Sequence, residues 1–257
     1  MESSGKRTLE KKIIQIYLMA EAVLFVLIQW AETTQPYAVT GKIMYTAIII
    51  NSIIIFIFYR NYRGDVRVPL AIMITMVADY NLTYLNQFFR TGVAWFVVVQ
   101  IVYAWKTRID IPSVILRLFF SAAYFALLIF LGMDRVDSLL CALSMGILTG
   151  NVIYGWKNYG RKTVEERSQR LEDPDFLLAL GLTLFAGCDL SLGLRNVLPS
   201  TGGISLWTLL YQVMYYLTWI CYLPSQVLLV LSYLKSVLRD PPDGGQVRNL
   251  HPAIDDK

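Results

Sequence analysis

The chain has 257 residues, of which 56% are hydrophobic and 16% are charged. An ordinary soluble domain has about 45–50% apolar and about 25% charged residues, so this composition argues against a water-soluble protein and indicates a polytopic membrane protein. The formal net charge of +4 is small and gives no reason to expect a nucleic-acid partner.

Eight apolar stretches approach or reach the length that a helix needs to cross a bilayer, about 17–25 residues. In chain order they cover residues 13–30, 37–59, 66–85, 91–105, 114–131, 138–156, 176–194 and 206–234. We therefore predict an all-α fold with eight transmembrane helices in residues 13–235. Residues 1–12 are expected to form a cytoplasmic N-terminus. Residues 236–257, which contain Pro241, Pro242 and Gly244, are expected to form a disordered cytoplasmic tail.

The basic residues are distributed unevenly between the two sides of this topology. Lys42, Arg90, Arg135 and Arg195 fall on one side, and the other 19 of the 23 Lys and Arg residues fall on the opposite side with both termini. Cytoplasmic segments carry the excess of Lys and Arg in membrane proteins. The pattern predicts cytoplasmic termini and an even number of spans in a multi-pass protein, for which we expect the cell membrane.

Histidine and cysteine restrict the chemistry of any intramembrane site. The single histidine, His251, lies in the polar tail, so imidazole is absent from the predicted spans as a metal ligand or base. The three cysteines, Cys141, Cys188 and Cys221, lie inside apolar stretches and resemble small hydrophobic residues more than a disulfide framework. We expect neither a cofactor nor a metal.

Three carboxylates fall at membrane depth: Glu21, Asp79 and Asp189. Ionisable groups in this position cost about 2.5–3.5 kcal/mol on insertion and therefore indicate function. Asp79 and Asp189 each lie about 20 Å from the cytoplasmic start of a span, at 1.5 Å per residue. We expect these two aspartates to occupy similar depths in the outer half of the bilayer.

The two aspartates also share a sequence context. Residues 79–86 and 189–196 match at the Asp, at the Leu three residues later and at the Asn seven residues later. The constant offset of 110 residues spans four helices and predicts a parallel repeat with halves 13–110 and 111–235, in which the two aspartates face each other. The alternative is that each aspartate forms hydrogen bonds within its own half.

Several short motifs resemble the lysoplasmalogenase (YhhN-like) family of eight-span membrane proteins. Asp189, preceded by Gly187 and Cys188, resembles the small–Asp–x–x–Leu helix of that family, and the segment around Asp79 resembles its earlier aspartate motif. Further similar segments are Thr40-Gly41-Lys42, Phe89-Arg90-Thr91-Gly92 and Tyr222-Leu223-Pro224-Ser225-Gln226. Ala78 stands where the family usually has glycine, and Gln100 stands where it has histidine. If that histidine takes part in catalysis, the chain is inactive or acts on another substrate.

The resemblance implies hydrolysis of the vinyl-ether bond of lysoplasmalogens, with a lipid or lysophospholipid as the substrate. It casts Asp79 and Asp189 as the catalytic acid and base, in an order that the sequence does not assign. The residues expected to bind substrate are Lys42, Asn86, Gln100, Arg195, Asn196, Tyr215, Tyr222 and Gln226. The alternative functions are a transporter or small-molecule-binding protein that uses the same carboxylates for protons or cations, and a non-catalytic scaffold.

Overall fold

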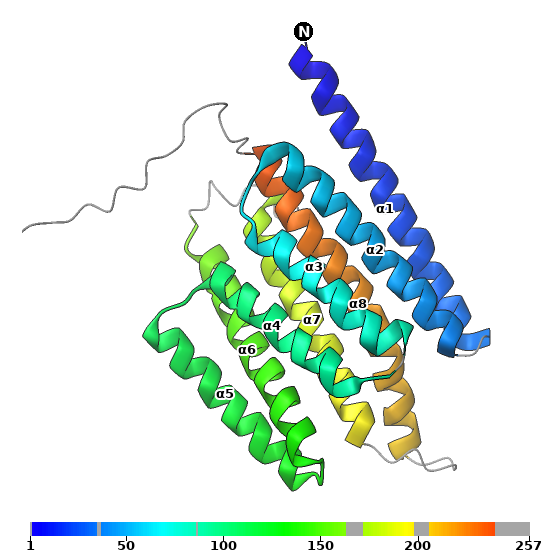
Figure 1. The fold of residues 1–257 in the computed structure, drawn as a ribbon, viewed down its shortest axis with the longest axis vertical. Coiled ribbons are helices and arrows are strands. Elements are labelled where there is room, and N and C mark those ends of the chain that lie inside the picture. The colour runs from blue at the N-terminus through cyan, green and yellow to red at the C-terminus, as the bar shows by residue number, and fades with distance from the viewer. Residues whose placement is uncertain (1, 35–36, 86, 163–171, 198–205, 240–257) are drawn as a thin grey trace, which may run out of the picture.

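The computed structural model describes residues 2–34, 37–85, 87–162, 172–197 and 206–239, and within these residues every regular element is a helix. The helices are α1 (Glu2–Thr34), α2 (Tyr37–Tyr62), α3 (Arg67–Asp79), the π-helix η1 (Tyr80–Tyr84), α4 (Phe89–Thr107), α5 (Ile111–Phe130), α6 (Arg135–Gly160), α7 (Pro174–Val197) and α8 (Leu206–Arg239). Successive α-helices run in alternating directions, so the start of α1 and the end of α8 lie at the same end of the bundle (Figure 1).

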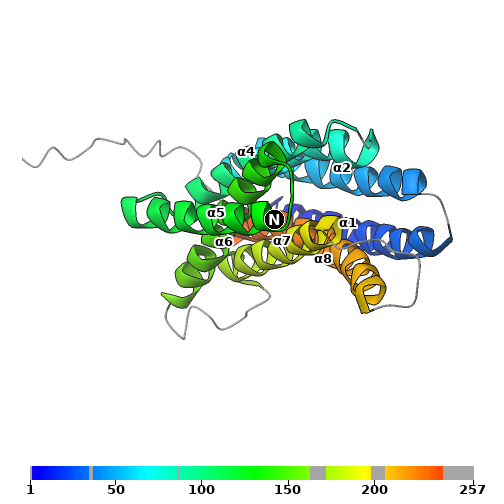
Figure 2. The same ribbon diagram turned by 90° about the horizontal axis from the view of Figure 1, so that it is seen from below.

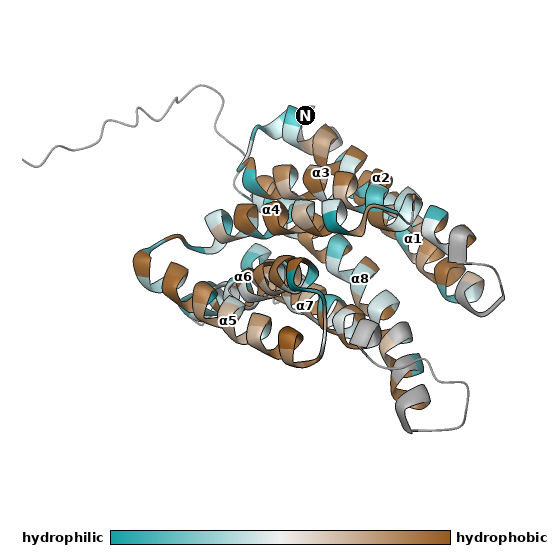
Figure 3. Ribbon diagram, turned by 60° about the horizontal axis from the view of Figure 1, so that its bottom comes forward, coloured by the Kyte–Doolittle hydropathy of each residue, from teal (hydrophilic) through white to brown (hydrophobic). Residues whose placement is uncertain are grey.

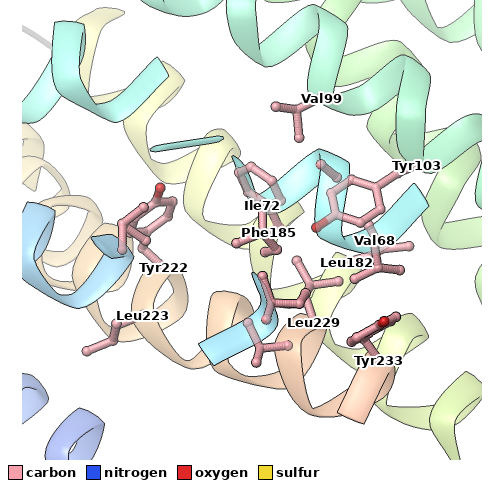
Figure 4. Packing of buried hydrophobic residues seen from close by; sticks show 14 of the residues in the cluster. Val68, Ile72, Val99, Tyr103, Leu182, Phe185, Tyr222, Leu223, Leu229 and Tyr233 are labelled. Carbon is pink, nitrogen blue, oxygen red and sulfur yellow. The ribbon is translucent and has the colours of Figure 1, made fainter. Parts of the chain in front are cut away.

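Six of the α-helices form a closed ring of neighbours. Around the ring, α2 packs on α3, α3 on α4, α4 on α6, α6 on α7, α7 on α8, and α8 on α2. The remaining two are peripheral: α1 packs on α2 and α8, and α5 packs on α6 (Figures 1 and 2). Large buried side chains from α3, α4, α7 and α8 meet inside the ring, including Ile72, Tyr103, Phe185 and Leu229 (Figure 4).

The prediction of a helical membrane protein is confirmed in its coarse form. Six helices, α1, α2, α5, α6, α7 and α8, are long and apolar enough to cross a membrane. The predicted third span instead divides into the 13-residue α3 and the short η1, and the predicted fourth span, α4, carries Gln100 in its middle. Many large apolar side chains are exposed, among them Ile115, Leu118 and Phe119 of α5. Most of the α5 ribbon carries the colours of hydrophobic residues (Figure 3). Exposed surface of this kind is suited to lipid.

The ends of the bundle differ slightly from the predicted boundaries. The first described residue, Glu2, already belongs to α1, so the predicted N-terminal segment 1–12 is helical from residue 2 onward. At the other end α8 continues to Arg239, beyond the predicted limit at residue 235. The rest of the predicted tail, residues 240–257, lies outside the described residues.

Two glycines allow α5 and α6 to approach closely. A Cβ atom on Gly146 would lie 2.2 Å from the Ser121 side-chain oxygen, and one on Gly150 would lie 2.4 Å from Cγ of Arg117. Small residues four positions apart are typical of tight helix packing in membranes. Both close approaches are contacts within the chain, between α5 and α6.

A charged clamp ties the α2–α3 connection to the end of α4. The carboxylate of Asp65 accepts hydrogen bonds from the guanidinium of Arg67 at 2.7 Å and from Nζ of Lys106 at 2.8 Å. Partial burial alone would raise the pKa of Asp65, but these two cations lower it well below its usual range. The clamp therefore favours the ionised form of Asp65.

Candidate functional site

Asp79 and Asp189 come together from two helices that do not adjoin in the ring. Asp79 is the last residue of α3 and is 2% exposed, and Asp189 lies on α7 and is partly exposed. The carboxyl group of Asp189 interacts electrostatically with that of Asp79. The structure thus brings together the pair that the 110-residue offset predicts.

A tyrosine from α8 completes this cluster. The hydroxyl of Tyr222 donates a hydrogen bond to the carboxylate of Asp79 and also interacts electrostatically with Asp189. Its ring packs edge-on against Phe185, with 6.1 Å between ring centroids (Figure 4). Phe185 packs in the same manner against Phe96 of α4. These aromatic contacts position the tyrosine hydroxyl beside Asp79.

The backbone changes its winding directly after Asp79. In η1 the backbone nitrogen of Leu85 donates to the carbonyl of Tyr80, five residues earlier, and the side chain of Thr83 donates to the carbonyl of Asp79 at 2.7 Å. Turns of π-helix are rare and frequently occur at functional sites. The α2 backbone approaches this turn at Gly41, where a Cβ would lie 2.3 Å from the Thr83 carbonyl oxygen. Close packing therefore holds the unusual turn in place.

Asp189 lies in the wall of an apolar pocket formed by η1, α4, α5, α6 and α7. The pocket has a volume of about 130 Å³ and is partly open to the surroundings. Phe96, Leu127, Met145 and Leu190 are among its apolar lining residues, and Asp189 is the one carboxylate among the described residues that line it. An engineered cavity of about 150 Å³ holds benzene, so this pocket has room for a ring or a short stretch of alkyl chain beside Asp189.

Two predicted substrate-binding residues lie inside the bundle but differ in what they contact. Gln226 is fully buried on α8, one turn after Tyr222, and its amide nitrogen contacts Oγ of Ser225 at 3.4 Å. Gln100 is also fully buried, but its side-chain oxygen accepts from the amide of Asn151 at 3.2 Å. Because Asn151 in turn accepts from Arg117, Gln100 belongs to a polar network centred on Arg117.

The basic residues that are predicted to bind substrate, Lys42 and Arg195, belong to the end regions of helices α2 and α7. Lys42 is exposed at the start of α2, next to Gly41. Arg90, a further basic residue on the same side of the predicted topology, is held by Asp137 at 2.7 Å and Asp134 at 3.1 Å. Four predicted site residues fall outside the described atoms: Asn86 entirely, and Arg195, Asn196 and Tyr215 as side chains.

The third membrane carboxylate, Glu21, lies on the peripheral helix α1. It is buried, and neither of its oxygens has a hydrogen-bond partner among the described residues. One turn earlier, the hydroxyl of Tyr17 donates to the side-chain oxygen of Asn51 on α2. Glu21 thus lies on the buried face of α1, and among the described residues no hydrogen bond joins it to the Asp79–Asp189 cluster.

Sequence reasoning missed the burial of Arg117, which counts as a loop-side charge in the topology prediction. The residue is 5% exposed on α5 and donates to Asn151, to Oγ1 of Thr107 at 3.1 Å and to the carbonyl of Ser113 at 3.1 Å. Ser113, Arg117 and Ser121 follow at intervals of four residues, so all three share one face of a helix. This polar stripe in an apolar helix is the sequence signal for a buried arginine.

No protein-family model matches the chain, and neither the curated proteins nor the solved structures include a match. The resemblance to the lysoplasmalogenase family therefore rests on the short sequence motifs alone.

Proposed function

We propose that this chain is an integral membrane hydrolase that cleaves the vinyl-ether bond of a lysoplasmalogen or a similar lipid. The observation that carries the proposal is the pairing of Asp79 with Asp189, with Asp189 in the wall of an apolar pocket. Two carboxyl groups in a desolvated site supply the acid and base that such a hydrolysis needs. Tyr222, bonded to Asp79, orients one of them.

The proposal includes eight spans and a parallel repeat, in which α3 continued by η1 and α4 also cross the membrane. Three pairs of helix contacts support the repeat: α2–α3 corresponds to α6–α7, α3–α4 to α7–α8, and α4–α6 to α8–α2. If each helix of one half is replaced by the helix four places away in the other half, the contacts around the ring are the same. The peripheral helices α1 and α5 also correspond to each other. Asp79 on α3 then corresponds to Asp189 on α7. With cytoplasmic termini in the cell membrane, both aspartates face the outer leaflet.

The chemistry requires one neutral and one ionised carboxyl group. The neutral acid donates its proton to the β-carbon of the vinyl ether, and the double-bond electrons form that new C–H bond, leaving an oxocarbenium ion at the neighbouring carbon. The second carboxylate stabilises this cation and takes a proton from a water molecule whose oxygen adds to it. The resulting hemiacetal loses the glycerol oxygen as an alcohol. One vinyl ether and one water thus give one fatty aldehyde and one glycerophospho-alcohol.

The pocket and the helix ends suggest how such a lipid lies. A pocket of about 130 Å³ accommodates the alkenyl segment next to the ether oxygen, while the rest of the chain extends into the membrane. Lys42 and Arg195 are the candidates for the phosphate, since basic side chains bind phosphate through charge-assisted hydrogen bonds. Arg90 is already paired with Asp134 and Asp137.

The decisive test is an aldehyde assay with purified protein and a defined lysoplasmalogen, in detergent and in proteoliposomes. The proposal is supported if the wild-type protein releases free aldehyde from the lysoplasmalogen and none from the corresponding ester lysolipid. The absence of aldehyde in both settings would rule out this substrate class.

A second candidate function, a proton- or cation-coupled carrier, is favoured by the repeat-like contacts of the two halves. Carriers commonly place a binding site between such repeats near the middle of the bilayer. Uptake into proteoliposomes that depends on a pH gradient, without any aldehyde release, would support this function instead. The same aspartates would then bind the coupling ion.

A further inference from the structure

Three cations gather around one tyrosine ring between the end of α4, the start of α5 and the end of α6. The guanidinium carbons of Arg108 and Arg117 lie 5.7 and 5.2 Å from the ring centroid of Tyr154, and Nζ of Lys157 lies 5.7 Å from it. Tyr154 itself is only 7% exposed. A cation near an aromatic face is attracted to it, but three cations around one ring also repel one another.

The negative charges near this cluster do not balance it. Arg108 forms an ion pair with Asp110, which also accepts a hydrogen bond from the backbone nitrogen of Ser113. Neither Arg117 nor Lys157 forms an ion pair among the described residues. Among the described residues, the cluster therefore has three positive charges and one paired carboxylate at a site between three helices.

The most deeply buried of these cations, Arg117, is held by close packing and by hydrogen bonds. Gly150 leaves room for the stem of Arg117, and Asn151, Thr107 and the Ser113 carbonyl accept its hydrogen bonds. A buried charge that forms no direct ion pair is costly, so the fold maintains a cationic site at Arg117 that packing alone does not require. Arg108 is partly exposed and Lys157 is exposed, whereas Arg117 is buried.

The cluster lies where lipid headgroups are expected. It occupies the end of the bundle that contains the start of α1 and the end of α8 (Figure 1), where the basic residues of the predicted topology concentrate. Trp105 and Trp156, on α4 and α6, are exposed close by in the sequence, and tryptophan is enriched at membrane interfaces. Basic pockets between helices on the cytoplasmic side bind anionic headgroups.

We propose that Arg108, Lys157 and the underlying Arg117 form a binding site for a phosphate group at this end of the bundle. The phosphate of an anionic phospholipid and free inorganic phosphate share the required chemistry. The site lies at the opposite end of the bundle from the pocket beside Asp189. It does not depend on the proposed hydrolase activity.

The test measures lipid binding to the purified full-length protein by native mass spectrometry. The probes are phosphatidylglycerol, phosphatidylcholine and, separately, inorganic phosphate. The variant R108Q/K157Q removes the two accessible charges. The matched control K12Q/R239Q removes two exposed charges from the same end, away from Tyr154. Helix content by circular dichroism checks that both variants fold, and K157E provides a single-site charge reversal.

The wild-type protein and K12Q/R239Q are expected to retain one phosphatidylglycerol in preference to phosphatidylcholine. R108Q/K157Q is expected to bind phosphatidylglycerol about 10- to 30-fold more weakly, and K157E at least as weakly. Retention of inorganic phosphate without a lipid preference, lost in the same variants, would assign the site to the free anion. The proposal would be overturned if the wild-type protein bound both lipids equally and retained no inorganic phosphate. It would also be overturned if K12Q/R239Q lost as much phosphatidylglycerol binding as R108Q/K157Q.

Discussion

The hydroxyl of Tyr222 donates a hydrogen bond to the carboxylate of Asp79, which joins α8 to the end of α3 across 143 positions of the chain. In the proposed hydrolase this bond orients Asp79 without contacting the scissile bond. Replacing Tyr222 with phenylalanine keeps the ring beside Phe185 and removes only the hydroxyl. We expect kcat to fall by up to about 10²-fold, as slight misplacement of a catalytic group can cause, with little change in KM. A steady-state aldehyde assay measures both constants, and an unchanged kcat would exclude the positioning role.

The two aspartates are expected to be essential for turnover but not for folding. Asp79→Asn and Asp189→Asn keep the side-chain shape and remove the titratable group, so each should lower kcat by about 10²- to 10⁴-fold. Asp137→Asn is the matched control, because Asp137 pairs with Arg90 outside the cluster. Full activity in either aspartate variant, with normal expression and elution in gel filtration, would make the pair structural.

Gly193 offers a way to close the pocket without disturbing the helices. It lines the pocket, and a Cβ built on it meets nothing within 4 Å. Gly193→Phe is therefore expected to fill part of the pocket and to raise KM for a long-chain lysoplasmalogen about tenfold or more, while the unfolding temperature stays nearly unchanged. Gly160→Phe on α6 is the control, because its Cβ also meets no atom within 4 Å and it does not line the pocket. Equal KM values in the two variants would remove the pocket from the substrate path.

Gly146 should respond to substitution in the opposite way. An alanine Cβ there would lie 2.3 Å from the backbone nitrogen of Ser121, so α5 and α6 would have to move apart. Overpacking of this kind typically costs about 1–3 kcal/mol. We expect Gly146→Ala to lower the thermal unfolding midpoint in detergent clearly, and Gly193→Ala to leave it the same or slightly higher. Similar midpoints would show that the α5–α6 contact is more adaptable than its geometry indicates.

The Asp65 clamp predicts a dependence of stability on acid. Its pKa is lower in the folded protein than its usual value of about 3.9, so the stabilisation is complete above about pH 4 and is lost as the pH falls toward the folded-state pKa. Asp65→Asn should therefore lower the thermal midpoint at pH 7, and the difference from wild type should shrink at pH 3. Asp134→Asn, at an exposed pair, is the control. A difference that is independent of pH would contradict the ionised clamp.

Much of the architecture follows from local patterns in the sequence. The apolar stretches locate the helices, and the offset between the two aspartate motifs predicts that Asp79 and Asp189 face each other. The partner of Gln100 could not be predicted in this way, because Asn151 donates to it from α6 and in turn accepts from Arg117 on α5. Periodicity also does not distinguish an α-helix from one that widens into a π-turn, so the division of residues 66–85 into α3 and η1 appears only in three dimensions.

The π-turn after Asp79 also has a consequence for how the protein tolerates length changes. A π-turn holds one more residue than the α-turn it replaces, so deletion of a single residue within Tyr80–Tyr84 would leave a shorter, regular α-helix. The later side chains of the turn would then take different directions about the helix axis. Leu82 would leave both the pocket wall and its contact with Gly92. The single surplus residue thus sets the rotational register between the aspartate and the pocket, and related sequences that keep the site are expected to keep this length between Asp79 and Phe89.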